Sequence, residues 1–135
     1  MDDLKYAVVC VDDDPYILQM LGFQLSKIVD QKCTLLEYFT DPQLALSNID
    51  ELVSEKIDII FIIVDYQMPE MTGGQLVRSI KAKYPDLKCV MLSGHANDVS
   101  VDDLVNENLL DAFISKPWDE GVLFDAIRPI LDKIS

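Results

Sequence analysis

The sequence predicts a single doubly wound α/β domain, in which a five-stranded parallel sheet is covered on both faces by five helices. Short apolar, β-branched segments alternate five times with longer amphipathic segments along the 135 residues, which is the pattern of parallel strands and crossover helices. The apolar fraction of 50% is enough for a continuous core, and the length fits one domain over residues 1–135. No internal repeat or Gly/Ser-rich linker marks a second domain.

The first strand is predicted at Tyr6–Val11, because this run is apolar without alternation, as in a strand buried on both faces. Asp14 and Pro15 then signal a helix start, with Asp as the N-cap and Pro at the first helical position. This helix is expected to pack on the sheet through apolar residues at helical spacing, namely Ile17, Leu18, Leu21, Leu25 and Ile28.

A second strand is predicted at Thr34–Phe39, and Asp41 with Pro42 repeats the helix-start signal. The apolar positions expected to face the sheet in this second helix are Leu44, Leu46, Ile49 and Val53. The run Ile57–Val64 has the strongest strand character in the chain and ends at Asp65. We therefore expect it at the centre of the sheet.

A loop through Pro69 and the Gly73-Gly74 pair leads to a third helix, which Pro85 terminates. The apolar face expected for this helix consists of Leu76, Val77, Ile80 and Tyr84. A fourth strand is predicted at Leu87–Leu92, directly before Ser93.

The last third of the chain is predicted to hold two helices and one strand. An acidic helix is expected from Asp98 to Asn108, a strand from Ala112 to Ser115, and a final helix from about Asp119 to Ile134. Pro129 removes one backbone hydrogen bond inside the final helix, so we expect a kink or weaker last turns.

The charge of the chain limits its partners. Eleven Lys and Arg stand against 24 Asp and Glu, a formal net charge of −13, which repels nucleic-acid phosphates and anionic lipid. No direct nucleic-acid or membrane binding is expected, and the apolar run Ile57–Val64 is too short to span a bilayer. The acidic N-terminus is unlike a signal peptide. Cys10, Cys33 and Cys89 form no C-x-x-C pair, which fits a reducing cytoplasm.

Polar residues follow the carboxyl ends of four predicted strands, in the order Asp12-Asp13, Asp65, Ser93 and Lys116. In a parallel sheet these ends share one edge, where the crevice at the switch in strand order binds ligands. Carboxylates gathered there repel one another unless a cation intervenes, and oxygen ligands with room for water suit Mg²⁺. A phosphoryl group on Asp65 would then meet the Ser93 hydroxyl and the Lys116 ammonium on its oxygens, with the Asp65 carboxylate as in-line nucleophile.

Four segments that carry these residues resemble the receiver domain of two-component response regulators. They are Val8–Pro15, Val64–Gly74, Met91–Ala96 and Phe113–Trp118. The resemblance spans nearly the whole chain, and it implies a flavodoxin-like sheet with the strand order 2-1-3-4-5.

The resemblance implies a role for each acidic position. Asp65 matches the phosphoacceptor, and Asp13, Asp65 and the backbone carbonyl of Gln67 match the Mg²⁺ ligands. Asp12 matches their acidic neighbour, which acts on the metal through water. The chain is thus expected to be a phosphorylation-dependent switch rather than a turnover enzyme on external substrates.

Other positions match the family's switch and phosphate contacts. Ser93 resembles the switch hydroxyl, Lys116 the phosphate-contacting lysine and Phe113 the switch aromatic residue. Gln67 and His95 occupy sites that border the path of the attacking water, so they are expected to tune dephosphorylation. On sequence grounds alone, Phe113 also fits a plain core residue and His95 a polar loop residue.

The resemblance also implies partners. A histidine kinase or histidine phosphotransfer protein is expected to donate the phosphoryl group, and a downstream effector domain or protein to receive the signal. Receivers often dimerise through their fourth helix, fifth strand and fifth helix, which makes such a homodimer an option here.

Two other functions fit parts of the pattern. A phosphohydrolase of the haloacid dehalogenase type would use Asp12 as its nucleophile and Asp14 two residues on, with Mg²⁺. That reading leaves Asp65 without a role. An interaction module with a degenerate acidic pocket would keep the fold but has no need of the five polar positions at the strand ends.

Overall fold

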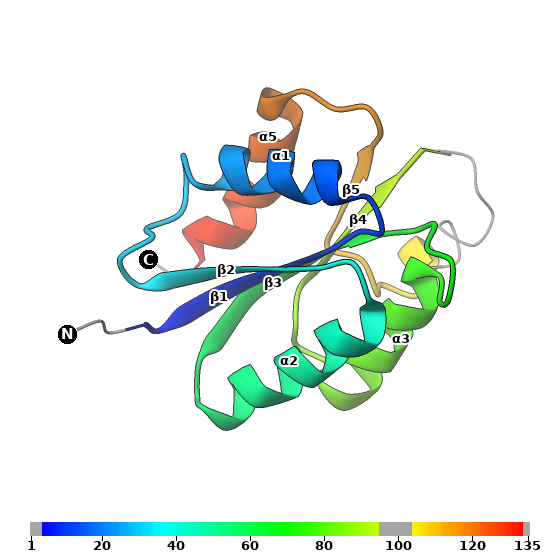
Figure 1. Cartoon of the computed structure of the whole chain (residues 1–135), viewed down its shortest axis with the longest axis horizontal. Coiled ribbons are helices and arrows are strands. Elements are labelled where there is room, and N and C mark those ends of the chain that lie inside the picture. Colours follow the sequence, from blue (N-terminus) through cyan, green and yellow to red (C-terminus); the bar gives the residue numbers. More distant parts are fainter. Residues whose placement is uncertain (1–3, 95–103, 134–135) are drawn as a thin grey trace.

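Five parallel strands form one sheet in the order β2-β1-β3-β4-β5 (Figure 1). The computed structural model describes residues 4–94 and 104–133. The strands are β1 Tyr6–Val11, β2 Thr34–Phe39, β3 Asp58–Asp65, β4 Cys89–Ser93 and β5 Ala112–Ser115. The predicted doubly wound α/β fold and its strand order are confirmed, and β3 is the central strand.

Helices cover both faces of the sheet. Their bounds are α1 Pro15–Leu25, α2 Pro42–Ser54, α3 Gly73–Lys83 and α5 Glu120–Asp132. Helices α1 and α5 lie on one face, and α2 and α3 lie on the other (Figure 1). Residues 104–106 are helical and form the described part of the predicted fourth helix, whose remainder before Leu104 lies outside the described residues, as does His95. No helix in the described parts of the chain combines the length and the hydropathy needed to cross a membrane.

The predicted helix starts are confirmed by side-chain caps. The Asp14 carboxylate accepts a hydrogen bond from the Tyr16 N–H at 2.9 Å, and the Asp41 carboxylate accepts one from the Gln43 N–H at 2.9 Å. Each cap satisfies a backbone donor that the first helical turn leaves unpaired. The two caps hold the amino ends of α1 and α2 at the edge where β1 and β2 end.

The strand sequence divides the core into two layers. In β1, Val9 and Val11 pack into the layer beneath α2 and α3, whereas Val8 and Cys10 pack into the layer beneath α1 and α5. Alternate side chains of a strand point to opposite faces, so an apolar run without alternation supplies both layers. This explains why the strands of this chain are almost continuously apolar.

The face that α2 presents to the sheet differs from the prediction. Leu44 and Val53 are 58% and 40% exposed. The buried residues of the helix are Pro42, Ala45, Ile49 and Leu52. Their spacing of three, four and three residues follows the helical period, so periodicity rather than side-chain size selects the buried face.

Three element boundaries also differ from the prediction. Helix α1 ends at Leu25, so Ile28 packs on the core from the turn that follows. Strand β3 begins at Asp58 and includes Asp65 as its last residue, one position later at both ends. Strand β4 begins at Cys89, whose N–H donates to the Asp111 carboxylate at 2.8 Å. At the start of β4 a side chain 22 residues later in the sequence accepts this bond, which local sequence does not record.

Candidate functional site

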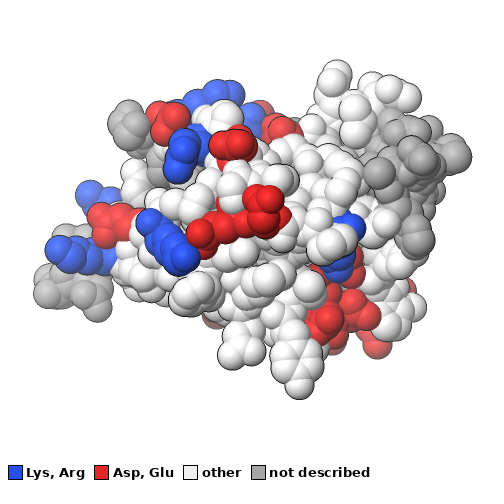
Figure 2. Space-filling model, turned by 90° about the horizontal axis from the view of Figure 1, so that it is seen from above, with Lys and Arg blue, Asp and Glu red and all other residues white. Residues whose placement is uncertain are grey.

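The carboxyl ends of the strands surround a pocket of about 680 Å³. Asp12 follows β1, Asp65 ends β3 and Lys116 follows β5, so three strands bring these side chains together. The lining of the pocket is Asp12, Asp13, Asp14, Asp65, Tyr66, Gln67, Met68, Pro69, Thr72, Gly94 and Lys116. Figure 2 shows acidic side chains gathered beside a basic one toward this end of the molecule. Four of the five polar residues predicted to converge, Asp12, Asp13, Asp65 and Lys116, therefore line one pocket at this rim, and Ser93 is not among its lining residues.

Lys116 joins two of the carboxylates. Its Nζ lies 2.9 Å from Oδ1 of Asp65 and 3.1 Å from Oδ2 of Asp12. Asp12 is fully buried, the Asp65 side chain is 6% exposed and the Lys116 side chain is 23% exposed. Charge-assisted hydrogen bonds in such a half-dry site are stronger than surface ion pairs. The ammonium thus holds both carboxylates in one orientation.

The main chain also orients Asp12. Its Oδ1 accepts a hydrogen bond from the Asp14 N–H at 2.9 Å, while its Oδ2 faces Lys116. The Asp14 carboxylate is turned away to cap α1. The two neighbouring acids therefore have different tasks, because one faces the pocket and the other supports the helix that borders it.

Asp12, Asp13 and Asp65 form the described group of side chains that could hold a metal ion. One oxygen atom from each carboxylate lies within 4.8 Å of the others, and Asp13 is the exposed member. Three carboxylates with an open, solvated side fit Mg²⁺, which prefers oxygen ligands and keeps several waters. Gln67 lines the same pocket from the loop after β3. The residues present therefore fit the predicted cation.

The pKa values of the site show charge that Lys116 does not fully balance. Burial raises the pKa of Asp12 to about 6, and the nearby Asp65 carboxylate raises it further. The hydrogen bond from the Asp14 N–H and the Lys116 ammonium lower this pKa, but by less. Burial likewise raises the pKa of Asp65. Lys116 lowers this pKa and Asp13 raises it, so the net shift is upward. Burial lowers the pKa of Lys116, but its bonds to Asp65 and Asp12 outweigh that effect and raise it. Added positive charge would stabilise this arrangement.

The predicted switch residues Ser93 and Phe113 are not among the residues that line the pocket, and they differ in burial. Ser93 ends β4 with 1% of its surface exposed, and its carbonyl accepts the Lys116 N–H at 2.8 Å. Phe113 in β5 is half-buried and packs against the core layer beneath α2 and α3. Gln67 is exposed at the rim. The structure therefore brings Ser93 into the same strand-end region as Lys116 and keeps Phe113 on a neighbouring strand.

Sequence reasoning missed a buried bond that supports the Lys116 segment. Trp118 lies just before α5 and is 9% exposed. Its Nε1 donates to Oε1 of Gln24 in α1 at 2.9 Å, so Gln24 is a buried polar residue on a helix. A glutamine on the apolar side of α1 was the signal in the sequence that could have pointed to a buried partner.

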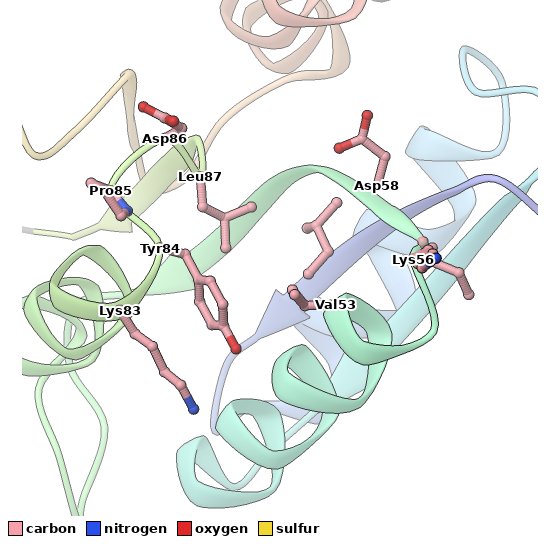
Figure 3. Close-up of a pocket in the computed structure, with 10 residues that line it drawn as sticks. Val53, Lys56, Asp58, Lys83, Tyr84, Pro85, Asp86 and Leu87 are labelled. Atoms are coloured by element: carbon pink, nitrogen blue, oxygen red, sulfur yellow. The ribbon is translucent and has the colours of Figure 1, made fainter.

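A second pocket, of about 590 Å³, lies at the opposite edge of the sheet, around the start of β3. Lys83 and Tyr84 extend from the end of α3 toward α2 in this region (Figure 3). Both contact Asp50 of α2, with Lys83 Nζ at 2.8 Å and the Tyr84 hydroxyl at 2.5 Å. These contacts tie α3 to α2 and lie away from the carboxylate cluster, so we assign this pocket a structural role.

Comparison with known proteins finds a matching family profile and similar proteins. The sequence profile described as the response regulator receiver domain matches residues 8–128. The Escherichia coli (strain K12) transcriptional regulatory protein GlrR is 29% identical over 93% of the chain, and the Pseudomonas putida (strain ATCC 700007 / DSM 6899 / JCM 31910 / BCRC 17059 / LMG 24140 / F1) response regulator protein TodT is 26% identical over 97%. The chain spans 26% of the length of the former and 53% of the latter.

A solved structure shares both the fold and part of the sequence. The response regulator receiver domain protein (CheY-like) from Methanospirillum hungatei JF-1 superposes with a TM-score of 0.77 at 25% identity. The match covers 96% of this chain and 95% of that one. The likeness therefore extends over the whole sheet and its helices.

Proposed function

The chain belongs to the response regulator receiver domain family, and from this premise we propose that it is a signalling switch that accepts a phosphoryl group on Asp65 with Mg²⁺ bound beside it. The observation that carries the proposal is the shared contact of Lys116 with Asp65 and Asp12 inside a three-carboxylate rim. Residues from three separate strands meet there, which a merely solvated acidic surface does not require.

Asp13, Asp65 and the Gln67 carbonyl would hold Mg²⁺, with Asp12 as their buried neighbour. When bound, the ion neutralises carboxylate charge and the charge on the phosphoryl oxygens. The chain's own contribution is to place these ligands. The Asp14 N–H fixes the Asp12 carboxylate at 2.9 Å, and Lys116 fixes the Asp65 carboxylate at 2.9 Å.

Phosphoryl transfer to Asp65 needs positioning and charge more than covalent chemistry from the protein. A carboxylate oxygen of Asp65 forms a bond to phosphorus, while the bond from phosphorus to the donor nitrogen or oxygen breaks and the donor keeps that electron pair. The Lys116 ammonium lies 2.9 Å from the attacking carboxylate. At this distance the ammonium can pair with the Asp65 carboxylate before transfer and with a phosphoryl oxygen after it.

The switch that follows would run through Ser93 and Phe113. A phosphoryl oxygen on Asp65 draws the Ser93 hydroxyl inward, and the half-buried Phe113 ring moves into the space released. Ser93 of β4 lies opposite Ser115 of β5, so a shift at the end of β4 acts directly on the strand that carries Phe113. The outcome is a packing change on the face of β5 opposite α5, in the core layer that also contains Leu104.

The partners proposed for this site follow from its chemistry. A phosphohistidine on a histidine kinase or a histidine phosphotransfer protein would supply the phosphoryl group, and an effector domain or protein would respond to the changed surface. A homodimer through the fourth helix, β5 and α5 is one form that the response can take. The excess negative charge of −13 argues against direct contact with nucleic acid or an anionic membrane. We propose a cytoplasmic location because Cys10, Cys33 and Cys89 form no C-x-x-C pair, which fits a reducing compartment.

The decisive experiment is to treat the protein with acetyl phosphate and Mg²⁺ and to locate the phosphoryl group by mass spectrometry. We expect one phosphoryl group on Asp65 and none in Asp65→Asn. Label on Asp12 with rapid turnover of phosphomonoesters would instead support the haloacid dehalogenase type. The cap that Asp14 makes on Tyr16 argues against that rival, because its second acid is engaged with the helix. If no aspartate carried a phosphoryl group, the proposed switch function would be wrong.

A further inference from the structure

Gly73, the first residue of α3, lies directly against the backbone of Asp65. A Cβ atom added to Gly73 would sit 2.3 Å from the Asp65 carbonyl oxygen and 2.8 Å from the Tyr66 Cα. The Gly73 N–H donates to the Tyr66 carbonyl at 2.7 Å. The first turn of α3 therefore packs on the main chain at the end of β3 with no side chain between them.

The need for glycine at this position is steric. No glycine in residues 4–94 or 104–133 has a positive φ, so alanine could adopt the backbone angles of Gly73. The alanine methyl group has no room, because a Cβ at 2.3 Å would have to move by about 0.7 Å to reach 3.0 Å, a limit that real Cβ contacts almost never cross. Either the end of β3 or the start of α3 must give way.

The end of β3 is the less movable side. Asp65 pairs with Leu92 of β4, and the Tyr66 N–H donates to the Leu92 carbonyl at 2.9 Å. Strand β3 also lies between two other strands, β1 and β4. The displacement would therefore pass to α3 and to the loop of residues 66–72, which lines the rim pocket and contains Gln67.

We propose that Gly73 is a positioning residue for the phosphoacceptor site. Because Gly73 has no side chain, the first turn of α3 packs directly on the end of β3. This contact fixes the loop of residues 66–72 and therefore the position of the Gln67 carbonyl relative to the Asp65 carboxylate. The inference rests on the function proposed above, because it explains how that site is held. A displacement of about 1 Å in such a site can cost on the order of a hundredfold in rate.

The neighbouring glycine offers a matched control. A Cβ added to Gly74 would lie 3.4 Å from Leu104 Cδ1, 3.6 Å from Tyr66 Cε1 and 3.7 Å from Thr72 Oγ1. These are ordinary contacts with side chains. Gly74→Ala thus adds the same methyl group one residue later in the same helical turn, without touching the Asp65 main chain.

The test compares wild type, Gly73→Ala and Gly74→Ala for Mg²⁺ affinity by calorimetry and for the rate constant of phosphorylation by acetyl phosphate at saturating Mg²⁺. For Gly73→Ala we expect a Kd for Mg²⁺ raised about tenfold or more and a rate constant lowered roughly 10- to 100-fold. For Gly74→Ala both values should stay within about threefold of wild type. Equal values for the two variants would overturn the proposal.

Two further variants separate positioning from general loss of stability. Leu52→Ala removes a buried side chain of α2 and should lower the melting temperature without changing the Kd for Mg²⁺. Gln75→Ala adds no atoms but removes the bond that the Gln75 side chain accepts from the Thr72 N–H at 2.9 Å. It loosens the same turn, so it should weaken Mg²⁺ binding several-fold. This variant decides the question if Gly73→Ala does not fold, because an unchanged Kd in Gln75→Ala would then refute the role of the turn.

Failure of the phosphoacceptor function is distinguishable from failure of this inference. If wild type takes no phosphoryl group on Asp65, the proposed function fails. The metal-free amide spectrum still tests the positioning. Gly73→Ala should shift the Tyr66 and Gln67 amide signals, and Gly74→Ala should leave the Gln67 signal in place. A Gln67 signal that stays fixed in Gly73→Ala would reject the positioning itself.

Discussion

The indole N–H of Trp118 donates a hydrogen bond to the side-chain carbonyl of Gln24 at 2.9 Å, which ties the segment after Lys116 to the last turn of α1. Both residues are buried, with 9% and 8% of their surfaces exposed. A buried donor that loses its partner costs more than the bond itself contributes. This bond therefore supports the position of Lys116 from two residues away.

Gln24→Ala should lower the free energy of unfolding by about 1–3 kcal/mol, because it leaves the indole N–H buried and unpaired. Trp118 is the one tryptophan in the chain, so its emission reports the change directly. We expect a shift of the emission maximum and a lower denaturation midpoint. Gln19→Ala, at an exposed position of the same helix, is the control and should change neither quantity. An unaltered emission spectrum in Gln24→Ala would contradict the bond.

Lys116→Met should destabilise the metal-free protein by about 1–3 kcal/mol, because it leaves the Asp12 and Asp65 carboxylates without their ammonium partner. Mg²⁺ should restore much of that loss, since it supplies positive charge to the same carboxylates. Melting temperatures with and without Mg²⁺ measure both effects. Lys27→Met removes an exposed pair with Glu120 and should have little effect at either condition. If Mg²⁺ raised the melting temperature of Lys116→Met by no more than it raises that of wild type, Lys116 and Mg²⁺ would not act on the same carboxylates.

Asp12 should make the metal-free protein pH-dependent. Burial raises its pKa from 3.8 to about 6, so between these values the folded protein binds more protons than the unfolded chain. Protonation of Asp12 therefore contributes to the free energy of unfolding. This contribution is complete below pH 3.8 and is lost as the pH rises through about 6.

Asp12→Asn should therefore raise the stability of the metal-free protein near neutral pH by about 1–3 kcal/mol, and the gain should vanish toward acid pH. The same substitution should weaken the stabilisation by Mg²⁺. Thermal melts across the pH range, with exposed Asp86→Asn outside the carboxylate cluster as the control, measure the difference. If Asp12→Asn remained equally more stable than wild type at acid pH, the charge of Asp12 would not be the cause of the stability difference.

Ser93→Ala should uncouple phosphorylation from Phe113. The hydroxyl at the end of β4 is the group proposed to move toward the phosphoryl oxygens, so its loss should leave the Phe113 ring signals of the phosphorylated protein near their unphosphorylated positions. Side-chain NMR of the ring makes the comparison. Ser115→Ala, which changes the residue opposite Ser93 in β5, should preserve the shift. Equal ring shifts in phosphorylated Ser93→Ala and wild type would remove the hydroxyl from the mechanism.

The lifetime of the acyl phosphate should depend on Gln67 and His95. Gln67 lies exposed at the rim of the pocket, and the resemblance to receiver domains implies that Gln67 and His95 border the path of the attacking water. We expect the Gln67→Ala/His95→Ala double variant to change the dephosphorylation rate constant by about 3- to 10-fold, because side chains at the rim control how water is oriented. Loss of label after removal of acetyl phosphate measures it. A rate constant identical to that of wild type would assign the lifetime to other residues.

Local sequence was sufficient for much of the fold. The bounds predicted for β1, β2 and β5 agree with the structure, because continuous apolar runs between turn residues admit few other arrangements. The Asp-Pro helix starts were also right, since an N-cap acts within three residues. The prediction failed for Leu44 and Val53 of α2, which are exposed, because the buried face follows the helical period of Pro42, Ala45, Ile49 and Leu52 rather than side-chain size.

The sequence by itself placed acidic and basic residues after successive strands, and so predicted which side chains share a rim. Only the tertiary structure decided how they meet there. The Lys116 ammonium sits between Asp12 and Asp65, and Gly73 touches the Asp65 carbonyl. Strand ends follow from a pattern of a few residues, whereas polar contacts of about 3 Å between strands and helices depend on the packing of the whole sheet.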